Sequence, residues 1–253
     1  MESPDKNNCS RLQRLFVEAD LASGKAFPAD KDQANYLLNV LRLKAGANVA
    51  VFNGRHGEWL AQVEIAGKRS CALCVVRQIR EQTGPGDIWY LFAPLKQARL
   101  DYMVQKAVEM GVSALVPVFT QHTQANRLND QRMQSNAIEA VEQCGGLNLP
   151  EIREAQKLEA VLERWPAERQ LVFCDETAAG DDPLHRLKEL AGKPMAVLIG
   201  PEGGFSSAER ERLNRLPFVT PIGLGPRILR ADTAAVAALA IVQAVAGDWQ
   251  NGR

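Results

Sequence analysis

The chain has 253 residues, of which 46% are hydrophobic, so it can bury one large core or two small ones and is not a disordered protein. Thirty basic and thirty acidic side chains give a formal net charge of +0. No global field therefore attracts the protein to nucleic acid, and any such contact depends on a local patch.

Compartment and membrane signals point to the cytoplasm. The chain has an odd number of cysteines and is too large to need disulfides, which indicates a reducing compartment. These cysteines are Cys9, Cys71, Cys74, Cys144 and Cys174. The first twenty residues mix charges and lack an apolar segment, so we expect no signal peptide. The most apolar run, Ala234–Ala246, is shorter than the roughly 20 residues of a membrane span, and we expect a buried helix and no membrane contact.

The N-terminal third is expected to form a small, mostly β domain. Residues 11–18 are strand-like, and Asp30 followed by Gln33 predicts a capping box at the start of a helix. Three β-type runs follow within residues 48–79, namely NVAVF, EWLAQVEI and CALCVVRQI. Turn signals between the first two runs predict a hairpin. We therefore predict a β domain over residues 1–80.

A linker centred on Gly84-Pro85-Gly86 precedes a region that alternates between apolar strands and amphipathic helices. The expected strands are IWYLFAPL, ALVPVF, LVFCDE, MAVLIG and FVTPIGL. The expected helices cover residues 100–111, 129–144, 183–191, 206–215 and 232–246. Continuous apolar strands between helices predict a parallel sheet covered on both faces, so the predicted fold class is α/β, with this domain spanning residues 81–253.

Several common catalytic signatures are missing from the sequence. It contains no G-x-x-x-x-G-K-[ST], no G-x-G-x-x-G after a strand, no H-E-x-x-H and no G-x-S-x-G. Cys71-x-x-Cys74 invites a redox or zinc interpretation, but residues three apart in a strand face opposite sides of the sheet. No second cysteine pair completes a site, and His56 and His185 have no ligand spacing. We expect structural thiols and no metal.

A glycine-rich segment leaves a predicted buried strand and enters a helix. It reads Gly200-Pro201-Glu202-Gly203-Gly204. Ligands bind at such carboxyl ends of strands in open α/β sheets, and glycines let a ligand approach the backbone closely. A Val at Gly203 is therefore expected to fill the ligand's space. Glu202, with no Lys after it, disfavours a phosphate, so the segment suits an uncharged or cationic ligand with hydroxyls. A tight turn without a ligand is the alternative.

A second glycine-rich turn follows the next predicted strand. It reads Gly223-Leu224-Gly225-Pro226-Arg227-Ile228-Leu229-Arg230. The pair Asp232-Thr233 is expected to cap an Ala-rich helix whose small side chains allow close backbone approach. Solvated arginines and an ordinary core helix are the alternative for this segment alone. Two glycine-rich strand ends together favour a bound small molecule.

These two segments resemble a known family. GPEGG followed by LGPRILRADTA is similar to the paired signature of the SPOUT methyltransferases, specifically the RsmE family, which methylates N3 of a uridine in 16S ribosomal RNA. Further similar stretches are Arg14-Leu15-Phe16, Val40-Leu41-Arg42, QKAVEMGV from Gln105 and EAVEQ from Glu139. The resemblance implies an N-terminal PUA-like β-barrel, a C-terminal trefoil knot that binds S-adenosylmethionine, and a homodimer with the active site near the subunit interface.

The resemblance also implies site residues. The cofactor would be held by Gly200, Pro201, Glu202, Gly203, Gly204, Leu224, Gly225, Ile228, Leu229, Thr233 and Asp175. Arg230 and Arg227 would donate hydrogen bonds to uridine carbonyl oxygens that gain negative charge, and Glu202 is either a proton acceptor or a loop-holding residue. The RNA contacts would be Arg14, Arg42 and His122.

This chain departs from the family pattern at some RNA-contact positions. His122 stands where many relatives have Arg, and Gly146, Leu147 and Asn148 replace frequent basic residues. We therefore expect weak affinity for free RNA and recognition of the uridine within a ribosomal particle.

Two other functions remain open on the sequence alone. One is a SPOUT enzyme with another RNA target, such as a ribose 2'-hydroxyl, although the small N-terminal β domain favours the uridine enzyme. The other is a non-catalytic RNA-binding scaffold, which has no need of S-adenosylmethionine.

Overall fold

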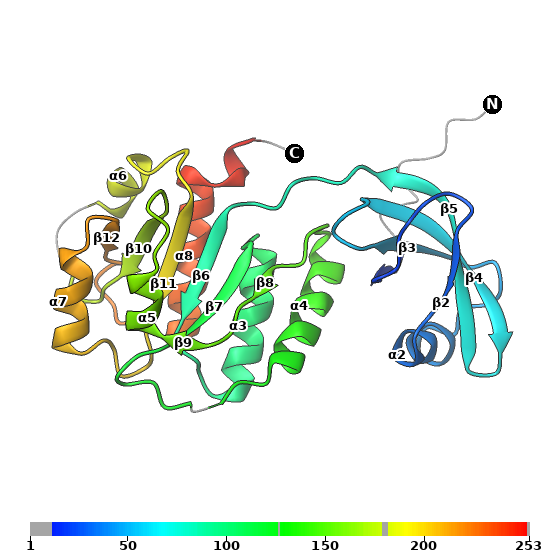
Figure 1. The fold of residues 1–253 in the computed structure, drawn as a ribbon, viewed down its shortest axis with the longest axis horizontal. Coiled ribbons are helices and arrows are strands. Elements are labelled where there is room, and N and C mark those ends of the chain that lie inside the picture. The colour runs from blue at the N-terminus through cyan, green and yellow to red at the C-terminus, as the bar shows by residue number, and fades with distance from the viewer. Residues whose placement is uncertain (1–11, 126, 179–181, 252–253) are drawn as a thin grey trace. The chain divides into compact units, whose positions relative to one another are not determined.

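The computed structural model of the chain describes residues 12–125, 127–178 and 182–251 (Figure 1). The chain divides into a first unit, Met1–Gly84 with Glu142–Asn148, and a second unit, Pro85–Val141 with Leu149–Arg253. The division falls four residues after the predicted one, and no sequence signal indicated that residues 142–148 join the first unit. Cys9 lies outside the described residues.

A five-stranded sheet with the strand order β1-β3-β4-β5-β2 forms the first unit. Its strands are β1 (Arg14–Phe16), β2 (Ala26–Pro28), β3 (Asn48–Phe52), β4 (Glu58–Gly67) and β5 (Ser70–Arg80). Strand β4 pairs antiparallel with β3 and with β5, so the predicted hairpin is confirmed. The sequence did not indicate that β1 pairs with β3 in parallel, or that β2 pairs with β5.

A short helix covers part of this sheet. Helix α2 (Lys31–Asn35) begins at the predicted capping box, in which Asp30 accepts from the Gln33 backbone and Gln33 accepts from the Asp30 backbone. A π-helical turn, η1 (Tyr36–Val40), continues it. Leu37 is fully buried, because the helix places it over the sheet.

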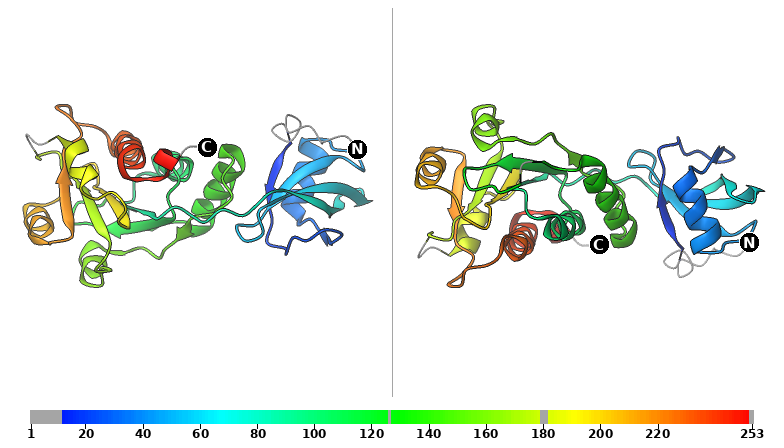
Figure 2. Two further views of the ribbon diagram at one scale, coloured as in Figure 1. Left: turned by 90° about the horizontal axis from the view of Figure 1, so that it is seen from above. Right: turned by 90° about the horizontal axis from the view of Figure 1, so that it is seen from below.

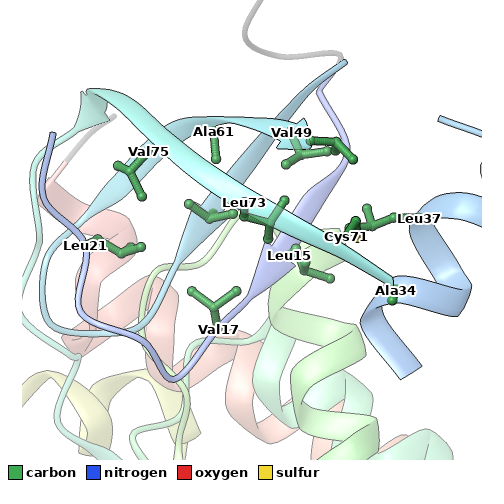
Figure 3. Close-up of a cluster of buried hydrophobic side chains, with 12 residues drawn as sticks. Leu15, Val17, Leu21, Ala34, Leu37, Val49, Ala61, Cys71, Leu73 and Val75 are labelled. Atoms are coloured by element: carbon green, nitrogen blue, oxygen red, sulfur yellow. The ribbon is translucent and has the colours of Figure 1, made fainter. Parts of the chain in front are cut away.

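The core of the first unit consists mainly of aliphatic side chains from the strands, from α2 and η1, and from the segment between β1 and β2 (Figure 3). Its labelled members are Leu15, Val17, Leu21, Ala34, Leu37, Val49, Ala61, Cys71, Leu73 and Val75. Cys71 is buried in this core, whereas Cys74 is partly exposed, as expected for strand residues three positions apart. Both thiols are free.

The second unit is built on a parallel sheet whose main path has the order β12-β10-β11-β6-β7-β8, with β9 paired to β7. Its strands are β6 (Ile88–Phe92), β7 (Ala114–Phe119), β8 (Glu151–Ile152), β9 (Gln156–Lys157), β10 (Gln170–Cys174), β11 (Met195–Ile199) and β12 (Val219–Ile222). Every pairing along this path is parallel, which confirms the predicted α/β class. Strands β8 and β9 were not predicted.

Helices cover both faces of this sheet (Figure 2). They are α3 (Gln97–Glu109), α4 (Asp130–Cys144), α5 (Leu158–Glu163), α6 (Pro183–Lys188), α7 (Ser207–Arg215) and α8 (Ala231–Ala246), followed by the 3-10 turn η2 (Asp248–Asn251). Helices α3 and α8 pack together on one face, and α5 and α7 cover the other (Figure 2). Helix α5 was not predicted from the sequence.

The start of α8 differs from the prediction. Its N-cap is Arg230, which forms no side-chain capping bond. Asp232 lies in the first turn, where its Oδ1 accepts from the backbone N–H of Thr233. The predicted Asp232-Thr233 cap is therefore wrong, because the helix begins one residue earlier and places both side chains inside it.

Candidate active site

Three strand ends meet at one edge of the parallel sheet. Strand β10 lies between β11 and β12, although these two are consecutive in the chain. Asp175, Gly200 and Gly223, which directly follow the three strands, are therefore neighbours. Ligand sites of open α/β proteins form at this edge, because connecting loops there leave space between the strand ends.

A cavity of about 1130 Å³ opens at this edge. Its size slightly exceeds the usual range for small-molecule sites, which is roughly 300 to 1,000 Å³. The sequence-predicted residues that line it are Asp175, Gly200, Pro201, Glu202, Gly204, Leu224, Gly225, Arg227, Ile228, Leu229 and Arg230. The structure thus brings most of the predicted site together around one space.

Two predicted cofactor residues do not line the cavity. A Cβ on Gly203 would lie 3.2 Å from the Cβ of His122, so this glycine faces His122. The expectation that a Val at Gly203 fills the ligand's space is therefore wrong, since its side chain would press on His122. Thr233 is exposed on α8 and lies outside the lining.

Three loop glycines serve the protein's own geometry. Gly204 has a φ of 67° and Gly225 a φ of 95°, in the left-handed region that favours glycine. A Cβ on Gly200 would lie 2.5 Å from the ring of Phe205, which packs against the strand end. The sequence pattern attributed these glycines to close ligand approach, whereas the structure also requires them for the turns and for the Phe205 contact.

Glu202 forms an ion pair with Arg99, which lies in the first turns of α3. Both side chains line the cavity. Sequence reasoning missed Arg99, although a basic residue in the first turn of the helix that follows β6 was a usable signal. Because Arg99 compensates the charge of Glu202, the geometry favours the loop-holding role of Glu202 over that of proton acceptor.

A second charged group lies on the β10 side of the cavity. Asp175 is 5% exposed and accepts from the backbone N–H and the hydroxyl of Thr177, at 3.0 and 2.9 Å. The guanidinium of Arg210 lies 3.3 Å from Asp175 and 3.5 Å from Glu176. The Arg210 Nε is buried without an aligned hydrogen bond, so this contact is one of charge. Sequence reasoning missed Arg210.

The two predicted catalytic arginines lie at the rim of the cavity. Arg227 and Arg230 are exposed and line it, with Ile228 between them in the chain. Among the residues that the structure describes, neither arginine forms an ion pair with a carboxylate. Ile228 is 88% exposed, an unusual state for a large aliphatic side chain. The rim therefore presents cationic donors and one apolar side chain to solvent.

Cys174 lies in the cavity wall at the end of β10. Burial raises the pKa of its thiol to about 12. The side chain is therefore a neutral, weakly polar part of the wall at physiological pH.

The predicted RNA-contact residues have different environments. Arg42 is exposed, with a φ of 55°. The guanidinium of Arg14 instead bonds within the protein: it lies 2.5 Å from Glu58 and donates to the carbonyl oxygens of Glu142 and Gly146, at 3.0 and 2.6 Å. It also lies 4.2 Å from the centre of the Phe52 ring. These contacts favour a structural role for Arg14 in place of the predicted RNA contact.

Leu147 and Asn148, at positions where the family resemblance led us to expect basic residues, also form contacts within the first unit. Leu147 is 5% exposed. Asn148 accepts from the Gln82 side chain at 2.7 Å and donates to the Thr83 carbonyl at 3.1 Å. His122, the third predicted RNA contact, lies against the glycine-rich loop of the second unit.

The part of the chain that the structure describes shows neither a metal cluster nor a membrane span. No cluster of three or more His, Cys, Asp or Glu side chains in this part of the chain could hold a metal ion. No helix within it has the length and apolar character to cross a membrane.

Comparison with known proteins identifies the family. The profile of an RNA methyltransferase domain matches residues 82–243, and that of an RNA methyltransferase PUA domain matches residues 29–73. Ribosomal RNA small subunit methyltransferase E of Rickettsia conorii is 28% identical over 92% of this chain and 96% of its own length. The Bacillus subtilis protein of the same name is 24% identical over 91% and 96%.

Solved structures show the same similarity. Ribosomal RNA small subunit methyltransferase E from Neisseria gonorrhoeae, bound to S-adenosylmethionine, matches with a TM-score of 0.81, 25% identity and coverage of 94% of this chain and 100% of its own. A Legionella pneumophila protein with bound cofactor matches with a TM-score of 0.81, 26% identity and coverage of 94% and 99%. With the family profile matching well over half of its length, this chain belongs to the RNA methyltransferase family.

Proposed function

We propose that this protein transfers a methyl group from S-adenosylmethionine to N3 of a uridine in 16S ribosomal RNA. The observation that carries the proposal is the cavity at the ends of β10, β11 and β12, with two exposed arginines at its rim. Similarity over nearly the whole length to small-subunit ribosomal RNA methyltransferases supports the substrate.

The cavity fits S-adenosylmethionine in size and chemistry. It combines apolar walls from Ile199, Leu224 and Leu229 with backbone groups of both glycine-rich loops. The carboxylates of Glu176 and Asp182 also line it and suit the hydroxyl and ammonium groups of this cofactor. When bound, the cofactor supplies an electrophilic methyl group on a sulfonium centre.

The protein's own contribution is positioning and electrostatics. The uridine N3 carries a proton at neutral pH and takes part in base pairing, so the base must be unpaired and must lose this proton. Arg227 and Arg230 can donate hydrogen bonds to the two carbonyl oxygens that flank N3. This stabilises the negative charge that develops there and favours the loss of the proton. Glu202, paired with Arg99, holds the glycine-rich loop.

The proposed substrate also sets the expected partners and location. We propose that Arg42 contacts the RNA backbone, that the protein acts in the cytoplasm, and that the uridine is presented by an assembling or assembled small subunit. We also propose a homodimer through a knotted second unit, which would cover the exposed Ile228. Light scattering that gives a monomer mass at micromolar concentration would contradict the dimer.

Nucleoside analysis tests the reaction. Small subunits from cells that lack the gene are incubated with the protein and S-adenosylmethionine, and digested 16S RNA is examined by mass spectrometry. We expect 3-methyluridine to appear with the wild type and to decrease strongly with Arg230→Ala, while cofactor binding persists. A ribose-methylated nucleoside would favour the other SPOUT chemistry, and no methylation with no cofactor binding would favour the scaffold.

A further inference from the structure

The loop Gly200–Gly204 has two sides, and only one of them faces the cavity. Gly200, Pro201, Glu202 and Gly204 line the cavity, whereas Gly203 faces the segment that follows β7. That segment places the imidazole of His122 against the loop. The affinity for a ligand that binds through the loop backbone therefore depends on the residues that contact the side of the loop away from the cavity.

His122 provides a directed contact with this loop. Its Nδ1 lies 3.1 Å from the carbonyl oxygen of Gly203 and 3.1 Å from that of Gly204. Carbonyl oxygens only accept hydrogen bonds, so Nδ1 carries the hydrogen and donates it to both. The bond thereby fixes two successive peptide groups of the cavity wall.

The packing around Gly203 points to the same contact. A Cβ at position 203 would lie 3.2 Å from the His122 Cβ, closer than a side chain usually approaches, and 3.7 Å from its Cγ, an ordinary contact. Glycine at 203 therefore lets the imidazole reach the loop carbonyls. The adjacent Gly204 has a left-handed φ, so the backbone turns at the point where His122 bonds it.

The same segment is tied to the helix that follows the loop. The backbone N–H of Gln121 donates to Glu209 Oε1 at 2.8 Å, and Glu209 is also the capping residue of α7. Its Oε2 accepts from the backbone N–H of Ser206 at 2.9 Å. The residues after β7 thus hold both the loop and the start of α7.

We propose that His122 is a positioning residue for S-adenosylmethionine: its Nδ1–H holds the backbone of Gly203 and Gly204 in the conformation that binds the cofactor. This inference rests on the proposed function, and it replaces the sequence-based role of His122 as an RNA contact. An exposed residue whose Nδ1 is committed to the loop acts on the cofactor through the loop backbone.

Calorimetric titration of the full chain with S-adenosylmethionine tests this role with three variants. His122→Leu removes the donor and is expected to raise the Kd about 3- to 10-fold, as for loss of one hydrogen bond. His122→Asn places an amide N–H near the position of Nδ1 and is expected to restore binding to within about twofold of the wild type. The control Gln124→Ala changes an exposed side chain of the same segment and is expected to leave the Kd unchanged.

Kinetics and a second substitution add independent readouts. His122→Leu should raise the KM for the cofactor while kcat at saturating cofactor stays within about twofold, because the lost contact acts on binding. The affinity for 16S RNA should not change. Gly203→Ala leaves His122 in the sequence but places a methyl group 3.2 Å from its Cβ, and this should displace the imidazole and raise the cofactor Kd.

The possible failures are distinguishable. A wild-type protein that binds no cofactor overturns the proposed function and this inference with it. A wild type that binds, with His122→Leu at the same Kd, overturns the inference alone. So does a His122→Asn variant that is as weak as His122→Leu, or a His122→Leu variant that loses only RNA affinity.

Discussion

Arg99 changes the role that the sequence alone assigned to Glu202. The carboxylate follows a strand end and precedes two glycines, a place that suits a proton acceptor. The structure pairs it with a guanidinium from α3, and the pair lies in the cavity wall. The ion pair gives this carboxylate a fixed partner in the wall, which favours its role in holding the loop.

A double-mutant cycle on this pair measures its contribution to cofactor binding. Both side chains are about one third or more exposed, so we expect a coupling free energy of only about 0.5 to 1 kcal/mol between Arg99→Ala and Glu202→Gln. Each single variant should raise the cofactor Kd. The double variant should lose less binding free energy than the two single variants lose together. Additive effects would show that the pair does not act as a unit.

Cys174 should be unreactive despite its place in the cavity wall. Its pKa of about 12 leaves almost no thiolate at pH 8, and the thiolate is the nucleophile. Iodoacetamide at pH 8 is expected to modify the exposed Cys144 and to spare Cys174 in the folded protein, with both modified after denaturation. Peptide mass spectrometry measures this, and rapid labelling of Cys174 in the folded chain would contradict the raised pKa of its thiol.

The raised pKa of Cys174 also makes the free energy of unfolding depend on pH. The folded-state pKa of Cys174 lies above the model-compound value of 9.0 that an unfolded chain approaches. Its neutral thiol therefore contributes stability fully below pH 9, and this contribution is lost as the pH rises towards 12.

At the scale of elements, Asp101 links α3 to α4. It accepts from Arg132 and Asn136 on α4 and from Gln97 on its own helix. The hydrogen bond from Arg132 is the main cause that lowers the pKa of Asp101, against an opposing effect of burial. A lowered pKa means that ionised Asp101 stabilises the fold above its unfolded-state pKa, and that this stability is lost as the pH falls through the folded-state pKa.

Asp101→Asn tests this link. We expect the variant to lose about 1 kcal/mol of unfolding free energy at pH 7, since a charge-assisted bond becomes a neutral one and Arg132 is largely exposed. The difference from the wild type should shrink towards pH 3. Urea unfolding at the two pH values measures it. An equal loss at both would indicate a packing effect of the substitution.

The elements that the sequence predicts and those that it misses differ in physical character. Strands such as MAVLI are buried on both faces, and helix α3 has one apolar face, so local composition alone indicates them. Strands β8 and β9 have two residues each, which is too short for an apolar run or an alternation of apolar and polar residues to indicate a strand. Their position comes from pairing with β7, which is a tertiary contact.

The candidate site divides in the same way. Both glycine-rich loops are local in sequence, and the prediction placed most of their residues correctly around one cavity. Arg99 lies about a hundred positions before the loop that it contacts, and Arg210, although it lies in the helix after that loop, pairs with Asp175 at the end of another strand. Only the sheet order brings these groups to the same edge. Gly203 also faces His122, which lies 81 positions earlier in the chain. A local sequence pattern cannot indicate such a contact.

At the scale of the whole molecule, a formal net charge of +0 makes RNA affinity depend on a few local cations. Arg14 is committed to contacts within the first unit, and Leu147 and Asn148 pack or bond there as well. These three positions therefore add no contact with an RNA phosphate. This predicts a shallow dependence of RNA binding on salt and a preference for a pre-shaped ribosomal particle.

Gly146→Arg tests whether the segment 142–148 meets the RNA. Each added phosphate contact should steepen the log-log salt slope by about 0.9, or nearer 0.7 for a single strand. A titration of one 16S RNA fragment at several salt concentrations should thus show a steeper slope and tighter binding for this variant. The matched control is Gly84→Arg, the same change at an exposed glycine with open space around it.

The comparison of the two variants separates a contact from a general effect of charge. If the added arginine acts only through the overall charge of the protein, both variants should change the salt slope equally. If it contacts a phosphate, only Gly146→Arg should steepen the slope. Thermal melts confirm that both variants fold. Equal slopes for a folded Gly146→Arg variant and the wild type would show that this segment does not reach the RNA backbone. Arg42 in the first unit would then be the position to test next for the RNA contact.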